Sequence, residues 1–96
     1  MYLLIVSYTK PVEDVAPFVQ AHSEWVKKYF NEGIFLFAGP KKNKFGGAIL
    51  AKSIDRSLLN KIISEDSFIV GEVAEYQVID FDCKVSAEGL DILTTV

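Results

Sequence analysis

The stretch IFLFAGPKKNKFGGAILA, residues 34–51, contains two short apolar runs separated by a polar turn. Residues 34–38 (IFLFA) and 47–51 (GAILA) have the length and composition of strands. The intervening residues 39–46 contain glycine and proline, which are typical of turns. The stretch therefore predicts a β-hairpin with a long polar tip.

The chain before this hairpin predicts one strand and one helix. Residues 2–8 (YLLIVSY) are rich in β-branched, aromatic and leucine side chains, which favour a strand. A helix is expected from Asp14, as its N-cap, to about Asn31. Pro17 is compatible with the first turn, whose N–H groups have no intrahelical partner, and Gly33 is placed to end the helix.

The chain after the hairpin predicts a second helix and a last strand. Asp55 is expected to cap a helix of about ten residues. Its apolar residues recur at helical spacing: Leu58, Leu59, Ile62 and Ile63. Residues 73–81 (VAEYQVIDF) predict the last strand, and residues 84–96 form a tail of no assigned structure.

This β-α-β-β-α-β order predicts one α+β domain over residues 1–96, with a core at residues 2–82. Two right-handed crossovers would place both helices on one face of a four-stranded antiparallel sheet, the ferredoxin-like arrangement. The other face would then meet water, yet the strand runs LLIV, IFLF and AIL are apolar on both faces. We therefore expect a homodimer in which a second copy covers the open face.

Composition excludes several classes of protein. Half of the residues are hydrophobic and 24% are charged, which is typical of globular chains, and no apolar run approaches the roughly 20 residues of a membrane span. The start of the chain lacks a basic and apolar leader, so a cytoplasmic protein is expected. The net charge of -3 disfavours nucleic acid as a partner. With one cysteine, Cys83, and one histidine, neither a disulfide nor a zinc site is expected.

The single histidine, His22, lies at the centre of the apolar arc of the first helix. At 100° per residue the arc contains Val15, Phe18, Val19, Trp25, Val26 and Tyr29, and the opposite side contains Gln20, Lys27, Lys28 and Asn31. The imidazole is thus expected to point at the sheet. It is either a core histidine that bonds a backbone carbonyl, or a general acid and base in an apolar pocket, oriented by a carboxylate.

Asp66 is the best candidate for that carboxylate, because it stands at an apolar corner and is followed by Ser67 and Phe68. The alternative is that it caps a short helical turn. Several aromatic residues would pack in the core or line a cleft for a planar ring: Tyr8, Trp25, Phe37, Phe45, Phe68 and Tyr76.

Three further interpretations receive little support. Lys41, Lys42 and Lys44 lack the spacing of a phosphate-binding loop, so they form a solvated tip or a lid that attracts an anionic substrate. RNA-recognition domains share the order of elements, but residues 44–51 place aliphatic side chains where bases would stack. Haem ligation by His22 is a distant alternative, because nothing indicates a distal pocket.

Taken together, four features resemble the YciI-like (YCII-related) family of small dimeric α+β barrel proteins over about residues 2–82. They are the opening strand YLLIVSY, Ala21-His22 followed eleven residues on by Gly33, Ala38-Gly39-Pro40, and Asp66-Ser67-Phe68. The resemblance implies a dimeric α+β barrel with His22 and Asp66 as a proposed active-site dyad, and Gly39 and Pro40 as pocket residues. This sequence departs from the family at Ser67, usually proline, and at Val19, often arginine, which puts binding of a carboxylate at that spot in doubt.

The family includes a dehydrochlorinase of chlorinated hydroxyhydroquinone in the breakdown of chloroaromatics, and the similar muconolactone isomerases share the fold. The resemblance therefore implies a lyase or isomerase that acts without a cofactor on a small phenolic or cyclic compound. His22 would take the proton and Asp66 would hold the ring tautomer. Expected substrate-binding residues are Tyr8, Trp25, Phe37, Gly39, Pro40, Ser67 and Phe68. The alternative is a non-catalytic, dimeric small-molecule-binding or accessory module.

Overall fold

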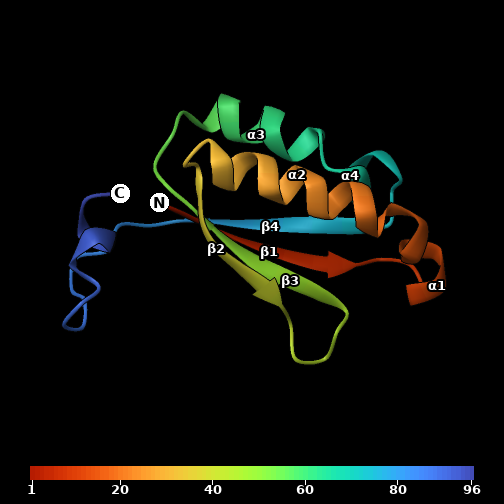
Figure 1. The fold of residues 1–96 in the computed structure, drawn as a ribbon, viewed down its shortest axis with the longest axis horizontal. Helices are drawn as coiled ribbons and strands as arrows, with labels where there is room; N and C mark the ends of the chain where they lie inside the picture. Colours follow the sequence, from red (N-terminus) through yellow and green to blue (C-terminus); the bar gives the residue numbers. More distant parts are fainter.

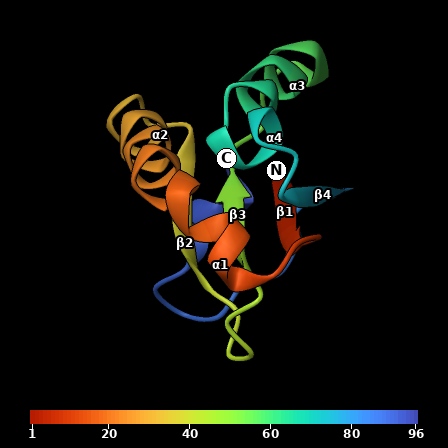
Figure 2. The same ribbon diagram turned by 90° about the vertical axis from the view of Figure 1, so that its right-hand side faces the viewer.

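Four strands form one antiparallel sheet in the order β2-β3-β1-β4, as the computed structural model of residues 1–96 shows (Figure 1). The strands are β1 (Tyr2–Tyr8), β2 (Phe35–Pro40), β3 (Gly46–Ala51) and β4 (Ala74–Asp80). The helices are α1 (Val12–Val15), α2 (Val19–Asn31), α3 (Arg56–Ser64) and α4 (Ser67–Val70). Figure 2 shows α2 and α3 next to each other on one face of the sheet. The predicted ferredoxin-like α+β fold is confirmed.

The first helical segment begins earlier than predicted and is interrupted. Pro11, and not Asp14, precedes its first residue, and the Pro11 carbonyl accepts from the amides of Asp14 and Val15. Asp14 therefore lies inside α1 and caps nothing. Pro17 has no N–H to donate, and the chain passes through a 3₁₀ turn at Ala16–Phe18 before α2 begins.

The hairpin strands extend further toward the tip than predicted. Strand β2 continues through Gly39 and Pro40, so the tip comprises only residues 41–45. Proline is tolerated there because β2 is an edge strand, where a missing N–H need not cost a ladder bond. The longer pairing brings the glycines of both strands to the same end of the sheet.

The second crossover contains two helices. Asp55 occupies the N-cap position of α3, as predicted, although its side chain accepts no backbone hydrogen bond. The corner at Asp66 forms α4, a helix of 4 residues that Asp66 caps through a bond from the Phe68 amide. The N-cap prediction for Asp66 is confirmed.

Two buried clusters lie between the helices and the sheet. The larger cluster surrounds Trp25 and contains Tyr2, Leu4, Tyr29, Phe35, Ile49, Ala51, Leu59 and Ile62. The smaller cluster contains Val6, Val15, Phe68, Val73 and Ala74. Tyr76 of β4 packs against both clusters, so it marks the boundary between them.

The opposite face of the sheet carries apolar side chains that no helix covers. Strand register places Leu3 beside Leu50 and Ile79, and Phe37 beside Leu50. Phe37 is 51% exposed and Ile79 is 39% exposed. The expected alternation is thus incomplete, as the sequence indicated, and the homodimer stays a prediction.

The last residues leave the sheet beyond β4. A 3₁₀ turn forms at Asp91–Thr94, and the Val96 carbonyl accepts a bond of 2.9 Å from the Ser53 amide. Figure 1 shows this segment beyond the end of the sheet that carries the N-terminus. None of the helices combines the length and the apolar character that crossing a membrane requires.

Candidate functional site

A cavity of about 410 Å³ lies between α2 and the strands β1, β2 and β3. Helix α2 lines it with Val19, His22, Ser23, Val26 and Lys27. The strands contribute aliphatic residues and glycines, and α4 contributes Phe68. Figure 2 shows the elements that surround the cavity: α2 lies above β2, and α1 lies at the end of α2 that is nearest the viewer. The wall from the strands is apolar, and the polar groups come mostly from α2.

His22 lines this cavity, and 19% of its side chain is exposed. Its Nδ1 lies 2.7 Å from Asp66 Oδ1, and its ring stacks on Phe68 at 3.9 Å between centroids and 6° between planes. Nε2 makes no hydrogen bond within the chain, yet no buried polar side-chain atom lacks a partner. Nε2 is therefore accessible from the cavity, while Nδ1 is held by Asp66.

Asp66 is fully buried, and three groups bond its carboxylate. Oδ1 accepts from the Phe68 amide at 3.1 Å and faces His22 Nδ1, and Oδ2 accepts from the Tyr76 hydroxyl at 2.6 Å. The two predicted roles of Asp66, helix cap and partner of His22, therefore hold at the same time. Cap geometry fixes the carboxylate, and the fixed carboxylate fixes the imidazole ring.

These bonds determine which nitrogen of His22 is available for proton transfer. The Phe68 amide and the Tyr76 hydroxyl donate to the carboxylate, so both oxygens of Asp66 act as acceptors. An ionised Asp66 accepts the Nδ1–H of His22, which leaves the lone pair of Nε2 directed away from Asp66 in the neutral ring. The arrangement can accept a proton from a bound molecule and return it to another atom of that molecule.

Tyr76 is a member of this network whose role the sequence did not indicate. Burial raises the pKa of the Tyr76 hydroxyl far above its usual value, and the charge of Asp66 and the hydrogen bond to it act in the same direction. Tyr76 therefore stays a proton donor to Asp66 throughout the neutral range. Nothing in the sequence around Tyr76 predicts this contact, because it depends on how β4 packs beneath α4.

Some of the predicted binding residues meet at the cavity and others do not. Tyr8, Gly39, Pro40 and Phe68 line it, and Tyr8 packs edge-on against Phe68 at 5.6 Å. Gly46, which was not predicted, is required where β3 approaches β1, because a Cβ there would lie 1.9 Å from the Val6 carbonyl oxygen. Gly46 and Gly47 consequently contribute only backbone to the strand wall.

Three predicted binding residues lie elsewhere. Trp25 is buried in the larger cluster, where its Nε1–H donates to the Ile62 carbonyl at 2.9 Å. Ser67 donates to the Phe18 carbonyl at 2.8 Å and so ties α4 to the start of α2. Phe37 lies on the open face, because a register shift between Phe35 and Phe37 breaks the alternation that would have placed both on the same side.

Helix α2 contacts the core with one side and lines the cavity with another, whereas a single apolar arc was predicted. Trp25 and Tyr29 face the core, whereas Ser23 and Lys27, one turn apart, line the cavity beside His22. Lys27 is exposed, as predicted, and it also borders the cavity. Residues 19, 23, 26 and 27 are three or four positions apart, so they share one side of the helix. The spacing alone does not show that a cavity lies beside that side.

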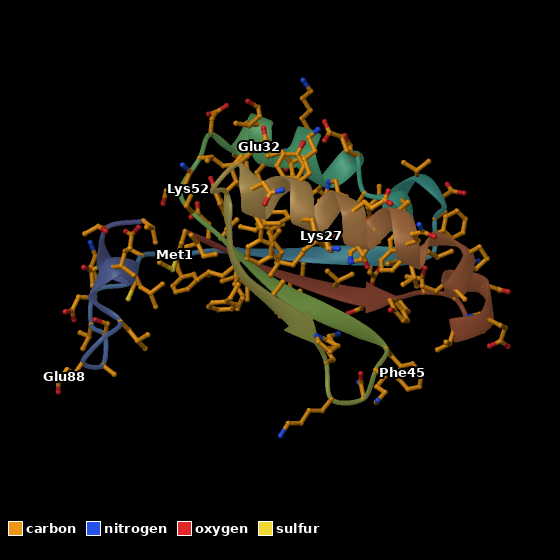
Figure 3. The ribbon with its side chains drawn as sticks, in the orientation of Figure 1. Met1, Lys27, Glu32, Phe45, Lys52 and Glu88 are labelled. Carbon is orange, nitrogen blue, oxygen red and sulfur yellow. The ribbon has the colours of Figure 1, made fainter.

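The basic tip of the hairpin takes no part in the cavity lining. Lys41 Nζ donates to Ser7 Oγ at 2.8 Å and thereby ties the start of the tip to β1. Figure 3 shows Phe45 on the other limb of the same tip, away from α2. The interpretation of these lysines as a lid has no support in this arrangement.

Comparisons with known proteins agree with this fold. The family model described as "YCII-related domain" matches residues 1–82. No curated protein sequence matches the chain. Among solved structures, the chain is similar to 5-chloro-2-hydroxyhydroquinone dehydrochlorinase from Burkholderia phenoliruptrix AC1100, in complex with 2,5-dihydroxybenzoquinone. The TM-score is 0.70 at 14% identity, over 85% of this chain and 94% of that chain. At this identity the likeness concerns the fold alone.

Proposed function

This chain belongs to the family of YCII-related domains, and from that premise we propose that it is a lyase or isomerase acting on a small phenolic or cyclic compound. The reaction would use His22 as general base and acid, with Asp66 holding its tautomer. The most concrete version is loss of HCl from a chlorinated hydroxyhydroquinone. The single observation that carries the proposal is the 2.7 Å contact between Nδ1 of a cavity-lining imidazole and a fully buried carboxylate.

The surroundings of the pair suit proton transfer on a planar ring. A cavity of about 410 Å³ falls within the usual range for small-ligand sites, which starts at about 300 Å³. Its apolar strand wall excludes water from the reacting atoms, which strengthens the interaction of a developing charge with His22. The glycines at one end of that wall leave room for a ring to approach α2.

The elimination balances without an external oxidant. His22 Nε2 takes a proton from one ring hydroxyl and delivers it to the chlorinated carbon, which becomes tetrahedral. Removal of a second hydroxyl proton by Nε2 then moves an electron pair through the ring and expels chloride with the C–Cl electrons. The products are a hydroxyquinone, chloride and one proton. The solved relative of similar fold, named for this type of reaction, is complexed with a dihydroxybenzoquinone, which supports this choice of substrate class.

The test is turnover of a panel of chlorinated and hydroxylated quinols, followed by chloride release and ultraviolet spectra. We expect His22→Gln and Asp66→Asn to lower the rate at least about 100-fold, the usual contribution of a positioned general acid or base. Glu65→Gln is the matched control, because Glu65 precedes Asp66 and does not line the cavity. Unchanged rates in both dyad variants would disprove the mechanism.

Binding without turnover would favour the alternative of a non-catalytic small-molecule-binding module. That alternative predicts ligand-induced shifts in melting temperature with no product from any quinol of the panel. It also predicts no need for a close contact between His22 and Asp66, so the observed contact argues for the enzyme.

We further propose that a second copy of the chain covers the open face of the sheet. Phe37 and Ile79 are exposed there beside Leu3 and Leu50, on a face that no helix of the same chain covers. Analytical ultracentrifugation tests this: a dimer is expected for the native chain, and Phe37→Asp should shift the population toward monomer. A native chain that sediments as a monomer at all concentrations would disprove it.

A further inference from the structure

The charges that line the cavity are strongly unequal. Among its 15 lining residues there is no aspartate or glutamate, and Lys27 is the one lysine. The nearest carboxylate to the reactive ring, Asp66, lies behind His22 and is already bonded by three groups. A molecule in the cavity would therefore meet a cation on α2 and no anion on the walls.

The ammonium of Lys27 has no partner within the chain. It forms neither an ion pair nor a hydrogen bond, whereas the next residue, Lys28, lies 4.0 Å from Glu65. Figure 3 labels Lys27 near the middle of α2, where the residue is exposed. Lys27 is an exposed residue, so its ammonium is open to a charged ligand at the cavity.

Ser23 lies one turn before Lys27 on the same side of α2 and also lines the cavity. Its hydroxyl makes no hydrogen bond to another residue of the chain. At a rise of about 1.5 Å per residue, Lys27 lies about 7.5 Å along the helix axis from His22, with Ser23 between them.

We propose that Ser23 and Lys27 form a binding subsite for an acidic substituent of the substrate, a carboxylate or an ionised hydroxyl. The inference rests on the proposed function, and it narrows the substrate class to anionic rings. The acidic group would bond to the ammonium of Lys27 and to the hydroxyl of Ser23. The ring would then lie along the glycine-lined strand wall, with its reacting hydroxyl at Nε2 of His22.

The one cation among the lining residues lies toward the C-terminal end of α2. Val19, where the resemblance leads one to expect arginine, lies one turn before His22 and Ser23 and lines the cavity. Val19 therefore places no charge at the N-terminal end of α2. Lys27 supplies a cation at the opposite end of the same stripe, so the substrate would be oriented with its acidic group toward the C-terminal half of α2.

The test uses two probes that differ by one group, 2,5-dihydroxybenzoate and 2,5-dihydroxybenzamide, titrated into the native protein by calorimetry. We expect the acid to bind about tenfold more tightly than the amide, as for a hydrogen bond to a charged group. In Lys27→Met this preference should fall to about twofold or less, with the affinity for the amide unchanged. Ser23→Ala should reduce the preference by a smaller factor.

Lys28→Met is the matched control, because it removes the same charge from the neighbouring residue, which does not line the cavity. It should retain the full preference. Equal affinity of the native protein for both probes, no detectable binding of either, or an equal loss in Lys28→Met and Lys27→Met would each overturn the subsite.

These outcomes are separable from those of the proposed function. A preference that depends on Lys27, together with turnover unaffected by His22→Gln, would leave the subsite in place and disprove the acid–base mechanism. Turnover that requires His22, together with no preference for the acid, would disprove the subsite alone.

Discussion

Two adjacent carboxylates, Glu65 and Asp66, each accept a hydrogen bond from a tyrosine hydroxyl. Glu65 pairs with Tyr29 of α2, and Asp66 pairs with Tyr76 of β4. The Glu65 side chain is 37% exposed and approaches the ammonium of Lys28 at 4.0 Å, whereas Asp66 has no exposed surface. The two pairs thus have the same chemical groups in different environments.

The difference shows that burial, and not the type of contact, makes one pair a candidate site. Water screens the bond of Glu65, which links the end of α3 to α2 at the surface. The bonds of Asp66 are made where water does not compete, and they position a histidine at a cavity. Glu65 and Asp66 are neighbours in sequence but differ in burial, because the chain turns inward between them at the cap of α4.

The largest expected effect comes from removing each charge in turn. Asp66→Asn should lower the free energy of unfolding by about 2–4 kcal/mol, because it breaks a buried, charge-assisted network. Glu65→Gln should lower it by less than about 1 kcal/mol. Urea denaturation with unchanged slope measures both. Equal losses would show that burial does not distinguish the two carboxylates.

Removing the tyrosine hydroxyls should give a smaller difference in the same order. Tyr76→Phe leaves Asp66 Oδ2 buried without its donor, which should cost about 1–3 kcal/mol in the free energy of unfolding. Tyr29→Phe leaves Glu65 free to bond with water and should cost less than about 1 kcal/mol. The double variant Asp66→Asn with Tyr76→Phe checks the assignment, because its loss should be clearly smaller than the sum of the single losses.

The smallest effect is a change in alkaline behaviour. Burial, the hydrogen bond to Glu65 and the charges of Glu65 and Glu32 raise the pKa of Tyr29 to about 12. A raised folded pKa means that the folded chain retains protons that the unfolded chain loses, so this stability is complete below pH 10 and falls as the pH rises toward the folded pKa. Ultraviolet titration should detect Tyr29 ionising near pH 12 in the folded chain.

Tyr76 provides the contrast in that titration. Its pKa is raised further, so it should ionise only as the chain unfolds. Tyr29→Phe should therefore remove a step that precedes unfolding, and Tyr76→Phe a step that coincides with it. A Tyr76 that ionised before unfolding would contradict its bond to Asp66.

Local patterns predicted most of the fold. Strand composition located β1 and the hairpin, and the apolar stripe of α3 followed from helical spacing, because side-chain periodicity is a property of neighbouring residues. The start of the first helix was misplaced. Pro11 and Pro17 are both compatible with the start of a helix. In the structure α1 begins directly after Pro11, whose carbonyl accepts the first amide hydrogen bonds.

The candidate site was predictable only in part. His22 and Asp66 were identified, and the structure brings them together, although their catalytic role stays a prediction. Trp25 was misassigned because an aromatic residue on an apolar face suits a core and a cleft equally well. Lys27 is exposed as predicted, but its place beside the cavity was missed, because helical geometry alone does not show where a helix leaves the sheet uncovered.

The sequence by itself determined the order of elements and the inward direction of His22, because each depends on spacing within one element. The tertiary structure alone decided that Tyr76 holds Asp66, that Phe37 lies on the open face and that Lys27 borders the cavity. Each of these depends on the distance between elements far apart in the chain. Such distances are set by the packing of the whole core, which no local pattern of residues records.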